Sequence, residues 1–135
     1  TYLFRNNIHK YVDMLKEYLN DGKLNVDLQC SVIRLIGKNN TDENGEYLAD
    51  YIDKHSEEEF WESITVATGI LGNFKKTDHL IDVLVDSLTS RVWYIRMNAA
   101  KSICRMGITQ VEVEKIRKRN DVYAMDALQY AMNRM

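Results

Sequence analysis

The sequence contains no proline, only two cysteines and only three histidines among its 135 residues. It has no uninterrupted apolar run of about 18 residues and no basic segment followed by an apolar one. These residues therefore include neither the pattern of a membrane-spanning helix nor that of a signal peptide. Apolar and polar residues rarely alternate with a period of two, which is the pattern of a half-buried strand. Together these absences favour helices throughout.

Cys30 and Cys104 lie within apolar helical patterns and lack the spacing of a zinc knuckle or a redox pair. We expect both to be buried thiols in a reducing compartment. With 45% hydrophobic and 28% charged residues, the chain has enough apolar side chains for one core, so we expect a single domain over residues 1–135. Because the first residue is Thr1, two settings stay open: a cytoplasmic protein, and a domain cut from a longer protein with an upstream anchor.

Charge is unevenly distributed along the chain, although the net charge is only -2. Residues 42–62 are strongly acidic, with Lys54 as their only lysine or arginine. Residues 91–119 are strongly basic, and Glu112 and Glu114 are their only acidic residues. The small net charge argues against a general nucleic-acid binder, whereas the basic third keeps phosphate binding open as an alternative.

Apolar residues at helical spacing predict eight helices. The first three are expected over residues 2–19, over 25–36 and after Thr41. The others are expected from Ser56 to Gly72, after Thr77, over 91–107, after Thr109 and from about Asp121 onward. Two segments, Ser56-Glu57-Glu58-Glu59 and Thr109-Gln110-Val111-Glu112, have the pattern of a capping box.

Three glycines that are expected to end helices, Gly37, Gly72 and Gly107, are spaced 35 residues apart. Each precedes a threonine suited to cap the next helix: Thr41, Thr77 or Thr109. A fixed period is needed when helical hairpins stack, because each hairpin presents the same two faces to its neighbours. An up-and-down bundle, the alternative at this size, needs no such period.

The stretch VLVDSLTSRVWYIRMNAAKSICRMG resembles a HEAT-like helical repeat. The resemblance implies an all-α, right-handed α-α superhelix of about four stacked helical hairpins. Two features differ from the family pattern, namely the absence of proline and the presence of Ser90 where an aspartate is often found. The positions that match the pattern are Ile95, Arg96, Ala99, Ala100, Ser102, Ile103 and Gly107.

No group of residues has the spacing that catalysis or metal binding requires. His9, His55 and His79 are far apart, and none has a second histidine or a cysteine three or four residues away. No His-Glu dipeptide, phosphate-binding glycine loop or nucleophile elbow is present. We therefore expect no enzyme activity, no metal and no cofactor.

In stacked hairpins the second helices usually line the concave surface. Within residues 91–107 the spacing predicts a buried stripe of Ile95, Ala99, Ile103 and Met106. The remaining residues are the candidates for partner binding: Trp93, Tyr94, Met97, Lys101 and Arg105. A shift of 35 residues places Glu58 and Glu62 at the positions of Trp93 and Met97, so we expect an acidic surface in the preceding repeat.

These patterns predict a non-catalytic scaffold for protein-protein interaction, with a protein or peptide partner. The alternative is a nucleic-acid-binding or DNA base-repair module of the HEAT-like type, which would use the basic C-terminal third together with Trp61, Trp93, Arg96 and Asp126. Within that third, residues 115–119 are either a phosphate contact or a solvated helix end. A third reading, regulation of a membrane enzyme, depends on an anchor outside these residues.

Overall fold

The computed structural model describes residues 2–55 and 57–134, with side chains from residue 10 onward. Within this part of the chain it contains eight α-helices and no strand, which confirms the all-α prediction. The helices are α1 (Tyr2–Asn20), α2 (Val26–Lys38), α3 (Asp42–Lys54), α4 (Glu57–Leu71), α5 (Asp78–Ser87), α6 (Trp93–Met106), α7 (Gln110–Lys118) and α8 (Val122–Asn133).

Side-chain caps begin most of these helices, as the sequence predicted. The hydroxyls of Thr41, Thr77 and Thr109 each accept a hydrogen bond of 3.2 Å from the backbone N–H three residues later. Glu112 completes the predicted capping box by accepting a hydrogen bond from the Thr109 backbone N–H at 2.9 Å. The other predicted box begins at Ser56, which lies outside the described residues.

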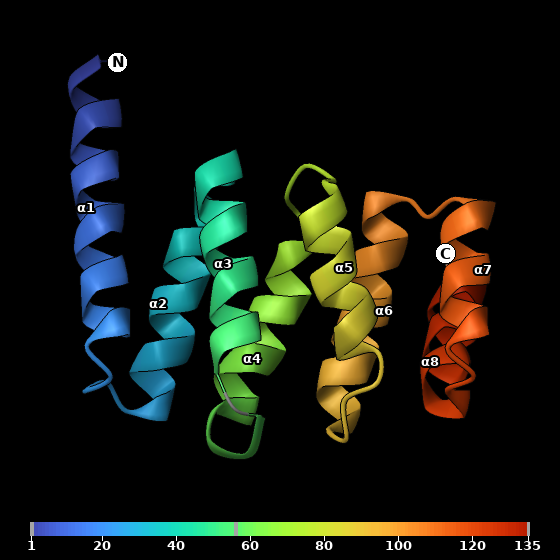
Figure 1. The fold of residues 1–135 in the computed structure, drawn as a ribbon. Coiled ribbons are helices and arrows are strands. Elements are labelled where there is room, and N and C mark those ends of the chain that lie inside the picture. Colours follow the sequence, from blue (N-terminus) through green and yellow to red (C-terminus); the bar gives the residue numbers. More distant parts are fainter. Residues whose placement is uncertain (1, 56, 135) are drawn as a thin grey trace.

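The helices stand side by side in chain order and form two layers (Figure 1). The odd-numbered helices α1, α3, α5 and α7 form one layer. The even-numbered helices α2, α4, α6 and α8 form the other, in which each helix packs against the next. The core lies between and within the layers, and its fully buried side chains include Ile33, Leu48, Ile64, Leu84 and Ile103. No helix in the described residues combines the length and apolar composition needed to cross a membrane.

The prediction that the periodic glycines end helices is confirmed for Gly72 and Gly107, which directly follow α4 and α6, and is wrong for Gly37. Gly37 lies inside α2, and only Gly107 has a positive φ, +88°, which favours glycine at a helix end. Gly37 and Gly72 also allow close packing between even-numbered helices. A Cβ atom on Gly37 would lie 2.4 Å from the Ile70 side chain, and one on Gly72 would lie 2.6 Å from the Ser102 backbone.

Polar side chains of α6 line its close contact with α4. Asn98 donates a hydrogen bond to the Thr65 carbonyl at 2.8 Å, and the Ser102 hydroxyl donates to the Thr68 carbonyl at 2.5 Å. Ser102 is fully buried, so its hydroxyl needs this partner. The contact between α4 and α6 therefore depends on small residues and hydrogen bonds as well as on apolar packing.

Candidate functional site

Three surface hollows lie between consecutive even-numbered helices. The first is lined by residues of α2, α4 and α6, and the other two by residues of α6 and α8. Their volumes are about 700, 460 and 310 Å³. Since no odd-numbered helix contributes to any of them, all three open on the side of the even-numbered layer that points away from the other layer. We call this surface the even-helix face.

Exposed aromatic side chains lie across this face. The ring of Trp61 on α4 stacks with Tyr94 on α6, with centroids 6.3 Å apart, and Tyr94 contacts the edge of Trp93 at 5.2 Å. Tyr123 and Tyr130 on α8 line the same hollow as Trp93. We call these five side chains the aromatic row. Each is at least 39% exposed, so together they present several aromatic rings to solvent.

The structure places most of the predicted α6 residues on the even-helix face. Trp93 and Tyr94 are 56% and 57% exposed and belong to the aromatic row. Lys101 is exposed one turn from Met97 and lines the last hollow. Trp93 lines a hollow with residues of α8, and more than half of its surface remains open to solvent.

The prediction that Met97 is exposed is wrong. Met97 is only 6% exposed and belongs to the hydrophobic core. It lies where α8 packs on α6 and forms one wall of a hollow together with Ala127. Met106, which was expected to belong to the buried stripe, is only partly buried. The buried surface of α6 is thus wider than the three-four spacing of its apolar residues indicated, because α6 packs against α4, α5 and α8.

Arg105 is exposed but also connects two helices. Its guanidinium donates hydrogen bonds to the Gly69 carbonyl at 2.7 Å and to the Asn73 side chain at 2.8 Å. Both partners are neutral, so these bonds hold the position of the side chain while its positive charge stays uncompensated. Arg105 therefore joins α6 to the end of α4 and at the same time contributes charge to the even-helix face.

The acidic part of this face lies between α2 and α4. Glu62 is half-buried and lines the first hollow together with Asp27 and Arg34. Glu58, in the first turn of α4, is exposed. Acidic Glu62 and basic Lys101 and Arg105 thus line hollows of the same even-helix face.

Several residues of the face were not among the predicted partner-binding residues, among them Trp61, Tyr123, Tyr130 and Arg134. Two of them left a signal in the sequence. Tyr130 and Arg134 are one helical turn apart, and the Arg134 guanidinium lies 4.7 Å from the Tyr130 ring. Tyr123 left no such signal in the sequence, because its partner Arg96 belongs to another helix. The Arg96 guanidinium lies 5.1 Å from the centre of the Tyr123 ring.

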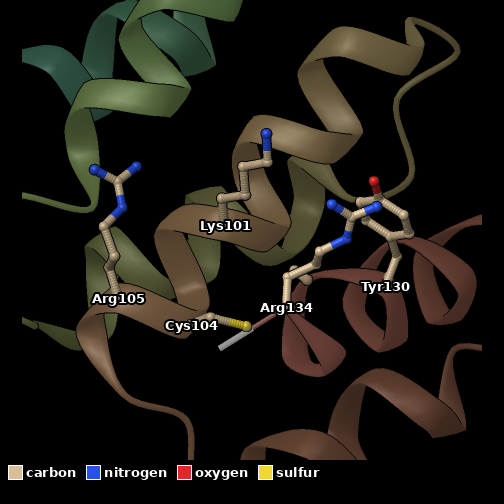
Figure 2. A pocket seen from close by; sticks show the side chains of 6 residues that line it. Lys101, Cys104, Arg105, Tyr130 and Arg134 are labelled. Atoms are coloured by element: carbon tan, nitrogen blue, oxygen red, sulfur yellow. The ribbon is translucent and has the colours of Figure 1, made fainter.

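The hollow between the last turns of α6 and α8 has a cationic rim (Figure 2). Lys101 and Arg105 come from α6, and Arg134 directly follows α8. Between them lie the buried side chains of Cys104 and Ala131 and the ring of Tyr130. No carboxylate of the described residues lines this hollow.

The cations of residues 115–119 lie on and just after α7, in the odd-numbered layer. Arg117 pairs with Glu114 on the same helix, and Arg119 pairs with Asp86 at 2.7 Å. The basic C-terminal third is thus divided between the two layers and partly neutralised in one of them. It does not form one continuous basic surface.

The residue types expected for base repair are partly brought together. Trp93, Arg96 and Asp126 line one hollow between α6 and α8. Trp61 lines the neighbouring hollow. Its ring stacks with Tyr94, which in turn contacts Trp93. Arg96 also donates a hydrogen bond to the Ser90 carbonyl at 2.9 Å, which holds the turn between α5 and α6.

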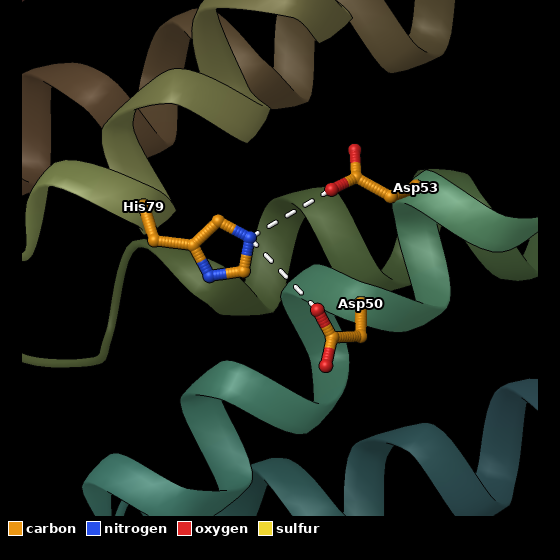
Figure 3. A group of neighbouring side chains, drawn as sticks. All are labelled: Asp50, Asp53 and His79. Carbon is orange, nitrogen blue, oxygen red and sulfur yellow. Dashed lines mark ion pairs between the residues drawn. The ribbon is translucent and has the colours of Figure 1, made fainter.

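His79 on α5 lies among carboxylates of α3, an arrangement that sequence spacing did not reveal (Figure 3). Its Nδ1 atom is hydrogen-bonded to Glu46, and its Nε2 atom lies 3.9 Å from Asp50 and 3.7 Å from Asp53. The hydrogen bond with Glu46 raises the pKa of His79, burial opposes this shift, and the two aspartates add to it. The three ligand atoms of Asp50, Asp53 and His79 lie within 4.8 Å of one another, which is close enough to share a cation. A protonated imidazole is equally satisfied there, since both its nitrogens face carboxylates.

Both thiols are buried, as predicted. Burial is the main cause of the raised pKa of Cys30 and of Cys104. A raised pKa keeps each sulfur in the unreactive thiol form at neutral pH. Neither residue therefore has the environment of a nucleophile.

No protein-family model, curated protein or solved structure matches this chain.

Proposed function

We propose that the chain is a HEAT-like α-α superhelix whose even-helix face is the concave surface, and that it acts as a non-catalytic scaffold for a protein or peptide partner. The tight packing along the even-numbered helices supports this curvature, because the layer with the closer neighbours lies on the inside of a curved stack. The protein contributes a surface whose shape is held by core packing, and the partner contributes a flexible segment that binds to this surface.

The observation that carries this function is the aromatic row. Tryptophan and tyrosine dominate the energetics of protein interfaces because a rigid ring buries a large area at a small cost in conformational entropy. A row that remains exposed on a folded domain leaves that area available to a partner. Hollows between successive helices on the same face provide places for the partner's own side chains.

The test is selection of peptides from a phage-displayed random library on the immobilised protein, followed by fluorescence anisotropy with the enriched peptides. Trp61→Ala and Trp93→Ala are expected to weaken binding at least tenfold, which corresponds to roughly 1.4 kcal/mol per residue. Tyr18→Ala is the matched control, because Tyr18 is 53% exposed on α1 in the other layer. Failure of any peptide to enrich, or equal losses with the control, contradicts the proposal.

A nucleic-acid-binding or base-repair function is the second candidate, favoured by the hollow that Trp93, Arg96 and Asp126 share. An aromatic ring and an arginine beside a carboxylate are suited to stack on and hold an exposed base. Anisotropy with labelled duplex and single-stranded DNA at increasing salt tests this candidate. Tight binding at physiological salt that Arg96→Gln abolishes would favour it over the scaffold.

A further inference from the structure

The cationic hollow between α6 and α8 is distinct in charge from the rest of the even-helix face. All the charged side chains that line it are positive: Lys101, Arg105 and Arg134. The hollow between α2 and α4, in contrast, contains Asp27 and Glu62 beside Arg34. A ligand that extends along the face therefore meets its strongest positive potential at the last two even-numbered helices.

These three cations have no carboxylate partner in the part of the chain that the structure describes. The ion pairs found there join other residues, such as Lys76 with Glu112, Lys16 with Glu43 and Arg119 with Asp86. Those pairs lie on the odd-numbered helices and the turns beside them. Several charges of the odd-numbered layer are thus paired within the chain, whereas the three cations around the hollow are left for a ligand.

The hollow combines this charge with an apolar floor. Cys104 and Ala131 are buried at its base, and Tyr130 forms one wall, stacked under the Arg134 guanidinium (Figure 2). Lys101 and Arg105 are one helical turn apart on α6, so their Cβ atoms lie about 6 Å from each other. In an extended peptide, alternate side chains are separated by about 7 Å along the same side. Carboxylates at alternate positions of a peptide therefore have about the spacing of the two α6 positions that carry the cations.

We propose that this hollow selects an acidic peptide segment of the partner, with two or more Asp or Glu residues beside one large apolar side chain. This inference rests on the proposed function. The apolar side chain enters the hollow over Cys104 and Ala131, and the carboxylates pair with Lys101, Arg105 and Arg134. Charge complementarity sets the specificity and the association rate, while the aromatic row and the apolar side chain provide most of the affinity.

A peptide fits this surface better than a nucleic acid does. The cations cover only the last turns of two helices, and Asp126 lines the neighbouring hollow on the same face. A phosphate backbone that extended past the cationic hollow would meet Asp126 and then the acidic region around Glu62. A short acidic segment avoids both.

The first experiment is the composition of the peptides that the library selection enriches. An excess of Asp and Glu next to Leu, Ile, Phe or Trp is the expected result. Enriched peptides without acidic residues overturn this inference but leave the proposed function in place. If no peptide enriches, both fail.

The second experiment measures anisotropy of a labelled Glu-Ser-Glu-Ser-Phe peptide, whose two carboxylates and aromatic ring lie on the same side of an extended chain, and of its Gln-Ser-Gln-Ser-Phe counterpart. The acidic peptide is expected to bind at least tenfold more tightly, and its binding is expected to weaken as salt screens the exposed pairs. Lys101→Gln and Arg134→Gln are each expected to weaken it about threefold to fivefold, as for exposed ion pairs. Lys118→Gln, which removes an exposed cation of α7, is the matched control.

Circular dichroism and thermal melts confirm that the variants stay folded, which is expected because Lys101 and Arg134 are exposed and form no hydrogen bond or ion pair that the core needs. Equal binding of the Glu and Gln peptides overturns the inference. So does stronger binding of a phosphoserine peptide with no affinity for the Glu peptide, or of single-stranded DNA that competes fully with the acidic peptide.

Discussion

Gly72 and Ser102 lie in direct backbone contact across the α4–α6 packing. A Cβ atom on residue 72 would come within 2.6 Å of the Ser102 Cα atom, and the Gly72 N–H donates a hydrogen bond to the Ser102 hydroxyl at 3.2 Å. The two residues belong to successive hairpins. The position of one hairpin on the next therefore depends on the absence of a side chain at residue 72.

Gly72→Ala is expected to lower the free energy of unfolding by about 1–3 kcal/mol, since the added methyl group meets backbone that cannot turn aside. Gly37→Ala is expected to cost less, because its Cβ atom would meet the Ile70 side chain and not main-chain atoms. Urea denaturation of both variants, with Lys38→Ala as an exposed control, measures the difference. A Gly72→Ala protein as stable as the parent would show that the helices separate easily.

Trp93→Ala is expected to reduce mainly peptide binding, whereas Met97→Ala is expected to reduce mainly stability. Trp93 is 56% exposed, so its loss should change the free energy of unfolding by less than about 1 kcal/mol and mainly reduce peptide binding. Met97 is 6% exposed and its truncation leaves a cavity, with an expected cost of about 2–5 kcal/mol. Thermal melts and peptide anisotropy on both variants separate binding from packing. A large stability loss in Trp93→Ala would assign that ring to the core.

The His79 cluster predicts a stability that declines as pH rises. The hydrogen bond with Glu46, opposed by burial and aided by Asp50 and Asp53, raises the pKa of folded His79 above its ordinary 6.5. The stabilising effect is therefore fully present below pH 6.5 and is lost as pH rises through the higher folded pKa. Melting temperatures across this range should fall more in the parent than in His79→Gln. Because the imidazole is partly exposed, the difference is expected to be small, and identical pH profiles would contradict it.

Glu112 predicts the opposite dependence at acid pH. Burial opposes ionisation of its carboxylate, but hydrogen bonds from Lys76 and Thr109 outweigh that effect and hold the pKa below its ordinary 4.5. Its contribution to stability is thus present above pH 4.5 and is lost as pH falls through the folded pKa. Glu112→Gln should flatten this part of the acid unfolding curve.

The capping box itself is tested by Thr109→Ala, with an expected cost of about 1 kcal/mol because the Glu112 N–H loses its acceptor at the start of α7. Val111→Ala is a control on the same helix, since Val111 is 67% exposed. If both changes cost equally little in urea denaturation, the cap does not stabilise the fold.

Much of the fold could be predicted because its signals are local. Helix ends depend on side chains a few residues apart, so Thr41, Thr77 and Thr109 identified the starts of α3, α5 and α7. The exposure of Trp93 and Tyr94 followed from the three-four spacing of apolar residues on α6. That spacing failed at Met97, because a helix with neighbours on three sides buries more than one stripe.

Only the part of the candidate site that lies on α6 could be predicted from the sequence. The α6 residues share one helix and therefore one periodic pattern, whereas Trp61, Tyr123 and Arg134 reach the same face from α4 and α8. The grouping of His79 with Asp50 and Asp53 likewise joins two helices whose relative position no local pattern states.

By itself the sequence determined the all-helical architecture and the starts of α3, α5 and α7, because propensity, capping and amphipathic spacing act within a few turns of one chain segment. Only the tertiary structure decided which side chains share a surface: that Gly37 and Gly72 serve close packing, that Met97 is core, and that Lys101, Arg105 and Arg134 surround one hollow without a carboxylate. The physical reason is that burial and charge pairing depend on what the neighbouring hairpin places opposite each residue, and that neighbour is about 30 residues away in the chain.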